Sequence, residues 1–170
     1  MRTISSLRVG RVRTLILLLL TLGWLIFIFS NSLQSGAESG AQSKRLLRFL
    51  QDLFRSMGYQ GELSEHVLRK LAHFGEFAIL TFLGCLDLWS ASLLSLSHTP
   101  RRVCLTAAAS VLFCFSTACV DEFLQRFTPG RGPRFTDSLI DTAGGLCAYL
   151  CFLALFFLIR ILRKRKSSAT

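Results

Sequence analysis

The chain has 170 residues, 51% of them hydrophobic, and a formal net charge of +10, with a mean hydropathy of +0.48. This composition excludes an ordinary soluble domain and is typical of an integral membrane protein, and the length suits a single domain over residues 1–170. No alternation of aromatic and basic residues indicates a nucleic-acid partner. We therefore attribute the basic excess to membrane topology and to attraction for anionic lipid.

Four apolar segments approach the ~20 residues that a helix needs to cross the hydrocarbon core. The predicted spans cover residues 14–30, 69–96, 103–122 and 138–162. The predicted fold class is thus all-α, a polytopic membrane protein with four transmembrane helices. The first span follows several arginines and also resembles a signal peptide, but Ser35 and Ala37, which could mark a cleavage site, lie beyond the apolar run. An uncleaved helix is therefore preferred.

An amphipathic helix is predicted between the first two spans. From Ser43 onward, Leu and Phe recur at helical spacing while Arg, Gln and Asp fill the other face, until Gly58 ends the pattern. Such a helix either lies at the outer membrane interface or packs its apolar face on the bundle, and both readings stay open. Residues 30–42 are rich in Ser, Gly, Asn and Gln and are expected to be irregular. A hydrophobic staple around Ser64 predicts that the next helix begins well before its apolar run.

Lysine and arginine are concentrated at the amino end, in the link between the second and third spans, and at the carboxyl end. Positive residues favour the cytoplasmic side of a membrane, and four spans place all three regions there. We therefore predict that both termini are cytoplasmic. The other two connections also contain acidic residues and are assigned to the outside.

A polar stripe runs along the second span. Arg69, His73, Glu76 and Asp87 fall on one helical face, because their spacings keep returning to the same side. His73 and Glu76 could hydrogen-bond or share a ligand, while Arg69 could bind an anion or neutralise Glu76. An internal ion pair that only holds helices together is the alternative. Asp87 is deeper, and we expect it to contact the third or fourth span.

Other polar residues gather at the same outer end of the spans. They are Ser32 after the first span, Asp121, Glu122 and Gln125 at the end of the third, Arg131 in a Pro-Gly turn, and Asp137 and Asp141 at the start of the fourth. Ionisable groups this close to the bilayer core are costly, so their side chains are expected to face one water-accessible pocket. Gly144 and Ala148 continue the face of Asp137 and Asp141 and favour close helix packing.

These residues resemble a known family. The motifs are Phe27-x-Phe29-Ser30-x-Ser32-x-Gln34, Arg69-Lys70-x-x-His73-Phe74-x-Glu76-Phe77-x-x-Leu80, Asp121-Glu122-x-x-Gln125-x-Phe127-x-Pro129-Gly130-Arg131 and Asp137-x-x-x-Asp141-x-x-Gly144. Together they resemble the VanZ-like family of bacterial integral membrane proteins, in which Asn is common at the position of Asp141. Because the founding member is associated with low-level teicoplanin resistance, the resemblance implies a cell-envelope role in the bacterial plasma membrane, without supplying a reaction.

Three functional classes fit the predicted cluster. In the favoured one, Arg69, Lys70 and Arg131 hold the phosphate of a membrane lipid or lipid-linked envelope precursor, while the other polar groups face its sugar or peptide part. These other groups are Gln125, Ser32, Asp137 and Asp141. The second class is a small membrane enzyme with His73 as base and Glu76, Asp121 or Glu122 as its orienter or as metal ligands. The third is a structural protein whose polar cluster only fixes helix register.

Cofactors and metals are not specified by the sequence. The six cysteines lie in or at the ends of the predicted spans and contain no Cys-x-x-Cys pair, so neither a zinc site nor a disulfide framework is indicated. The spacing of His73 and Glu76 is too common to define a metal site, and no residue is assigned to one. The oligomeric state is equally unspecified.

Overall fold

The computed structural model describes residues 4–90 and 100–167. Over these residues the chain forms five helices and no strand, namely α1 (Ile4–Ser32), α2 (Gly36–Ser56), α3 (Glu65–Ser90), α4 (Pro100–Gln125) and α5 (Phe135–Ser167). Four segments are long and apolar enough to cross a membrane, Gly10–Ser32, Glu65–Ser90, Ala108–Gln125 and Phe135–Ile159. The predicted all-α fold with four spans is confirmed. Residues 91–96 of the predicted second span lie outside the described residues.

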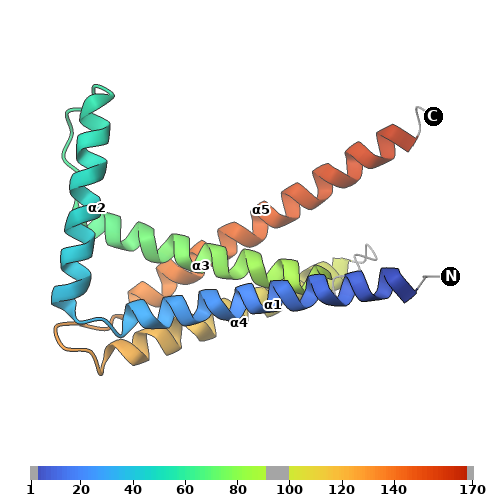
Figure 1. Ribbon diagram of the computed structural model, residues 1–170, viewed down its shortest axis with the longest axis horizontal. Helices are drawn as coiled ribbons and strands as arrows, with labels where there is room; N and C mark the ends of the chain where they lie inside the picture. Colours follow the sequence, from blue (N-terminus) through green and yellow to red (C-terminus); the bar gives the residue numbers. More distant parts are fainter. Residues whose placement is uncertain (1–3, 91–99, 168–170) are drawn as a thin grey trace.

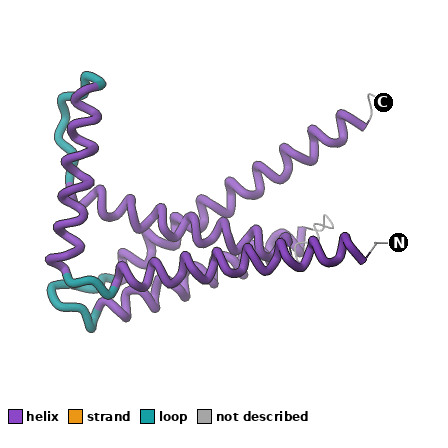
Figure 2. Tube along the Cα trace, viewed as in Figure 1, coloured by secondary structure: helices purple, strands orange, loops and turns teal. Residues whose placement is uncertain are grey.

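The four spanning helices form a bundle that is open at one end. Helices α1, α3 and α4 run alongside one another, and α5 crosses them before its carboxyl-terminal half diverges (Figure 1). Helix α2 lies across the other end, next to the loops that join α1 to α2 and α4 to α5 (Figure 2). We call this the α2 end. The first residues of α1 and the last residues of α5 lie at the opposite end, as an even number of crossings requires.

Helix α2 is longer than the sequence analysis predicted. It begins at Gly36 rather than at Ser43, so the expectation of an irregular segment up to residue 42 was wrong. The backbone amide of Glu38 donates to the Ser35 side chain, and the Ser35 amide donates to the Glu38 carboxylate at 3.0 Å. This capping box satisfies amides that the helix start leaves free, which offsets the poor helix propensity of the glycines and serines that follow. The hydrogen bonds from Ser35 lower the pKa of Glu38.

The apolar face of α2 is not covered by the bundle. None of its 21 residues is buried, and Leu46, Phe49 and Leu53 are all exposed. The helix ends before Gly58, whose φ of 90° is in the region that favours glycine. An uncovered apolar face on a helix lying across a bundle end favours the interfacial reading over packing on the bundle.

Helix α3 is the central helix and contacts all four others. A buried cluster of Ile28, Phe77, Leu80, Cys114 and Ala118 joins it to α1 and α4. Its most extensive packing is with α5. There a side chain at Gly144 would collide with the carbonyl oxygen of Phe74, so the backbones touch as the small-residue face of the fourth span predicted.

Asp87 has a different partner from the one expected. Its Oδ2 atom accepts a hydrogen bond of 2.6 Å from the Thr21 hydroxyl on α1, whereas the sequence analysis assigned it to the third or fourth span. Close by, the hydroxyls of Thr14 and Ser90 lie 2.8 Å apart, and Arg13 also donates to Ser90. Because α1 carries no charged residue from Thr14 to its end, its role as the partner of Asp87 could not be predicted from charge patterns.

Candidate functional site

The loop between α4 and α5 is fixed against the junction of α1 and α2. The Gly36 amide donates to the carbonyl of Pro129 at 2.9 Å, and the Thr128 hydroxyl donates to the carbonyl of Ser32 at 3.2 Å. A side chain at Gly36 would collide with the Gly130 carbonyl, and Gly130 itself has a φ of 74°. Two glycines are therefore needed where these loops cross, and the crossing determines where Arg131 lies.

Arg131 is tied to the backbone rather than to a carboxylate. Its Nη2 and Nε atoms donate to the carbonyls of Asn31 and Gln34 at 2.9 and 3.3 Å. Asn31 belongs to the last turn of α1, where carbonyls lack partners within the helix, and Gln34 lies two residues beyond the helix end. Burial, followed by the nearby charge of Arg69, lowers the pKa of Arg131, although an arginine remains protonated in proteins. Arg131 therefore holds the α1–α2 junction in addition to facing the site.

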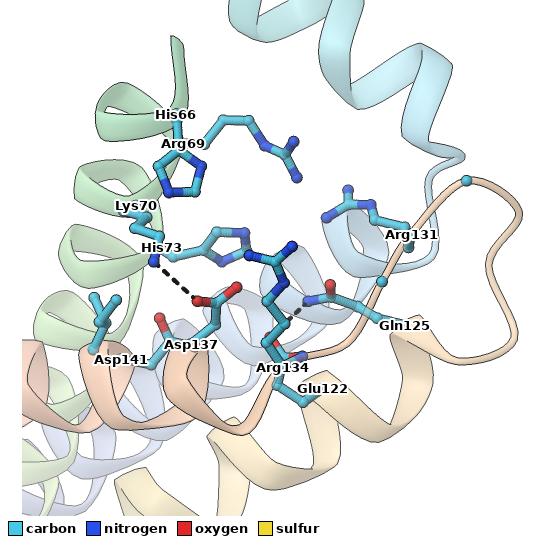
Figure 3. A pocket seen from close by; sticks show the side chains of 13 residues that line it. His66, Arg69, Lys70, His73, Glu122, Gln125, Arg131, Arg134, Asp137 and Asp141 are labelled. Atoms are coloured by element: carbon cyan, nitrogen blue, oxygen red, sulfur yellow. Dashed lines mark hydrogen bonds and ion pairs between the residues drawn. The ribbon is translucent and has the colours of Figure 1, made fainter. Parts of the chain in front are cut away.

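A cavity of about 230 Å³ opens beside Arg131. It is bounded by α3, the end of α4, the α4–α5 loop and the start of α5, and Figure 3 shows side chains from all four converging on it. Its lining residues are His66, Arg69, Lys70, His73, Glu122, Gln125, Gly130, Arg131, Gly132, Arg134, Asp137, Ile140 and Asp141. We call it the central cavity.

Two of the acidic residues of the central cavity have partners. Asp137 forms an ion pair of 3.3 Å with Lys70. Glu122 accepts a hydrogen bond of 2.7 Å from the backbone amide of Arg134 and a longer one from Gln125. Within the described part of the chain, the guanidinium groups of Arg69 and Arg134 form neither a hydrogen bond nor an ion pair. The cavity therefore presents unpaired positive charge.

Two further carboxylates lie buried below the guanidinium groups. Asp121 is fully buried and accepts hydrogen bonds from the Ser32 hydroxyl at 2.5 Å and from the side-chain amide of Gln125 at 3.0 Å. Asp141 is 1% exposed. Potential ligand atoms of His73, Asp121 and Asp141 all lie within 4.8 Å of one another. We call His73, Asp121 and Asp141 the floor cluster. Two of them, His73 and Asp141, also line the central cavity.

Glu76 faces a second, smaller cavity of about 160 Å³ on the side of α2. Its Oε1 atom accepts a hydrogen bond of 3.2 Å from Asn31. Its Oε2 atom is 3.8 Å from Nδ1 of His73, too far for a hydrogen bond. Arg69 and Glu76 are both described and form no ion pair, so the internal tether considered for them is not formed. Arg69, His73 and Arg131 line both cavities.

Two ionisable residues that line the central cavity were not predicted from the sequence. His66, which was given no role, is exposed at the mouth, and Arg134 extends over the cavity (Figure 3). His66 precedes Arg69 and His73 by three and seven residues, so helical periodicity already placed it on the polar face of α3. Arg134 stands one residue before α5, where no periodicity could place it.

Comparison with models of known protein families gives a match to the family described as VanZ/LLP1, over residues 15–160. The match extends from α1 into α5 and includes every residue of both cavities. No curated protein and no solved structure matches the chain.

Proposed function

The chain belongs to the VanZ/LLP1 family, and on that premise we propose that this multi-pass membrane protein binds the anionic head group of a membrane lipid or lipid-linked envelope precursor. The binding site is the central cavity. Phosphate is the group that such molecules share, and guanidinium groups hold it by charge-assisted, often bidentate hydrogen bonds.

One observation carries this proposal: Arg69 and Arg134 converge on the cavity without a partner in the described part of the chain. Structural arginines normally pair with a carboxylate or a carbonyl, as Arg131 does with Asn31 and Gln34. Two unpaired guanidinium groups that face the same space repel each other, and an anion between them would relieve that repulsion. Lys70 is less available because Asp137 already neutralises it.

The dimensions of the cavity favour a head group rather than a whole lipid. A volume of about 230 Å³ is below the range of ~300–1,000 Å³ typical of pockets for drug-sized ligands. The acyl chains would lie outside the bundle, along the apolar surfaces of the spans. Gln125 and Ser32, considered above as ligand contacts, both donate to Asp121 and therefore support the floor of the site.

Lipid binding can be measured with purified full-length protein by native mass spectrometry, using phosphatidylglycerol as the anionic probe and phosphatidylcholine as the zwitterionic one. We expect the double variant Arg69→Gln/Arg134→Gln to lose about tenfold or more in affinity for phosphatidylglycerol, which corresponds to ~1.4 kcal/mol. Arg126→Gln is the matched control, because Arg126 is an exposed arginine at the same end that faces Phe123 rather than the central cavity. Equal affinity in the double variant and the native protein would refute the proposal.

The proposal includes a role in the cell envelope of a bacterium, with the α2 end outside and both termini cytoplasmic. The distribution of lysine and arginine supports this orientation.

Cells that lack the protein should then change in susceptibility to teicoplanin, and the double variant should fail to restore the native susceptibility. Reporter fusions should find residue 170 in the cytoplasm; an external carboxyl terminus would reverse the orientation and place the cavity on the cytoplasmic face.

A further inference from the structure

The floor cluster combines an imidazole with two carboxylates, which come from three different helices. His73 belongs to α3, Asp121 to α4 and Asp141 to α5. We propose that these three side chains bind one divalent transition-metal ion, with Zn²⁺ and Mn²⁺ as the best-suited candidates. The inference goes beyond head-group binding and does not depend on it, since it concerns the metal alone.

Unsatisfied buried atoms are the first support for this site. Oδ1 of Asp141 and Nδ1 of His73 are both buried and have no hydrogen-bond partner in the described part of the chain. Asp141 is 99% buried, and a carboxylate oxygen in that position without a partner is destabilising. A cation coordinated by Asp141 would supply the missing partner.

The charge balance at the floor is the second support. Asp121 and Asp141 lie close together, and neither forms an ion pair with a lysine or arginine of the described part of the chain, which includes all the arginines of the central cavity. Arg131 is held by backbone carbonyls, and among the described residues Lys70 forms an ion pair with Asp137 alone. Two buried carboxylates this close repel each other unless a cation or a proton lies between them.

The donor set indicates the kind of metal. Imidazole nitrogen suits zinc and other transition metals, whereas carboxylate oxygen suits Mg²⁺, Ca²⁺ and Mn²⁺, so a mixed set favours Zn²⁺ or Mn²⁺ over Mg²⁺. Ligands bonded to one tetrahedral ion at ~2.1 Å lie about 3.4 Å apart. The three donor atoms, within 4.8 Å of one another, would therefore move closer together on binding the ion.

The surrounding structure holds the proposed ligands in place. Ser32 and Gln125 each donate to one oxygen of Asp121, which is how residues around a metal site commonly orient a carboxylate ligand. Next to His73, the backbone of Phe74 touches Gly144, three residues after Asp141. This contact fixes the spacing of α3 and α5 at the level of the cluster.

Three protein ligands leave coordination positions open, and these would face the central cavity, which His73 and Asp141 line. In zinc enzymes, an open position of this kind holds water or substrate, whereas structural zinc sites are closed by four protein ligands. An anion in the central cavity would then contact both the metal and the guanidinium groups of Arg69 and Arg134.

The test uses purified full-length protein that has been washed with a chelator and then titrated with Zn²⁺ by calorimetry or with Mn²⁺ by electron paramagnetic resonance. We expect one ion per chain. Changes in residues around a metal site cost about 10–100-fold in affinity, so His73→Gln and Asp141→Asn, which remove ligands, should each cost at least about a hundredfold. Asp137→Asn is the matched control: it removes a carboxylate of the same cavity that is not in the floor cluster, and should change affinity far less.

Thermal melts of the same variants separate metal binding from misfolding. Without metal, Asp141→Asn should melt no lower than the native protein, because it removes an unpaired buried charge. With metal, only the native protein and Asp137→Asn should gain melting temperature. Absence of saturable binding by the native protein, or unchanged affinity in both His73→Gln and Asp141→Asn, would overturn the site. Arg69→Gln/Arg134→Gln should still bind the metal, so failure of head-group binding and failure of this inference remain distinguishable.

Discussion

The two ends of helix α3 use polar residues in different ways. At the end far from α2, Asp87 accepts a hydrogen bond from Thr21, and Ser90 contacts Thr14 and Arg13, so polar groups on α3 find partners on α1, although Oδ1 of Asp87 is buried without a partner among the described residues. At the α2 end, Arg69 and Arg134 lack partners within the described residues, and so do buried atoms of His73, Glu76 and Asp141. The first arrangement joins helices. The second is incomplete in both charge and hydrogen bonding, and an external ligand would complete it.

Arg131 combines the two roles, and its removal should have the largest effect on stability. Arg131→Ala deletes two hydrogen bonds from a charged donor to the carbonyls of Asn31 and Gln34, each worth about 1.5–3 kcal/mol. Because Arg131 is only partly buried and its bond to Gln34 is long, at 3.3 Å, we expect less than the sum, a loss of about 2–4 kcal/mol in unfolding free energy, measured by chemical denaturation in detergent. From the sequence, this arginine was interpreted mainly as a ligand contact. Unchanged stability would restore that reading.

The point where the α1–α2 junction crosses the α4–α5 loop should be the next most sensitive to substitution. Gly36→Ala forces a methyl group against the Gly130 carbonyl, and overpacking of this kind costs about 1–3 kcal/mol. Gly40→Ala is the matched control within α2, because its nearest neighbour would be a Glu65 oxygen at 3.9 Å, an ordinary contact. Since alanine favours helix over glycine, the control should keep or raise the melting temperature. Equal effects of the two substitutions would show that the loops do not meet tightly.

The opposite end of α3 should give a smaller, purely structural effect. Thr21→Val removes the donor to Asp87 and keeps the shape of the side chain, at a cost of about 1 kcal/mol. Thr142→Val is a suitable control, because among the described residues the Thr142 hydroxyl donates only to the Ser138 carbonyl of its own helix, at 2.6 Å. The control should change the melting temperature less than Thr21→Val does. A larger change in the control would mean that the contact between α1 and α3 adds nothing to stability.

The spans and the polar face of α3 could be predicted from the sequence, because hydrophobic length and helical periodicity are local properties. The early start of α2 was missed, since composition outweighed the capping box of Ser35 and Glu38 in that prediction. Contacts between side chains on different helices could not be predicted from these local patterns. Asp87 bonds to a threonine on α1, and Arg131 bonds to backbone carbonyls, which carry no sequence signal. The floor cluster likewise depends on three helix ends meeting, which spacing along one chain segment cannot predict.

One paired measurement tests the division between the two ends most directly. Arg69→Gln and Thr21→Val are compared with the native protein for melting temperature and for binding of phosphatidylglycerol. We predict that Arg69→Gln binds the lipid several-fold more weakly at an unchanged melting temperature, because Arg69 has no partner to lose within the described structure. We predict the reverse for Thr21→Val, which should melt lower and bind normally. If Arg69→Gln lowered the melting temperature and left binding intact, the polar cluster at the α2 end would be structural, and the proposed head-group site would be contradicted.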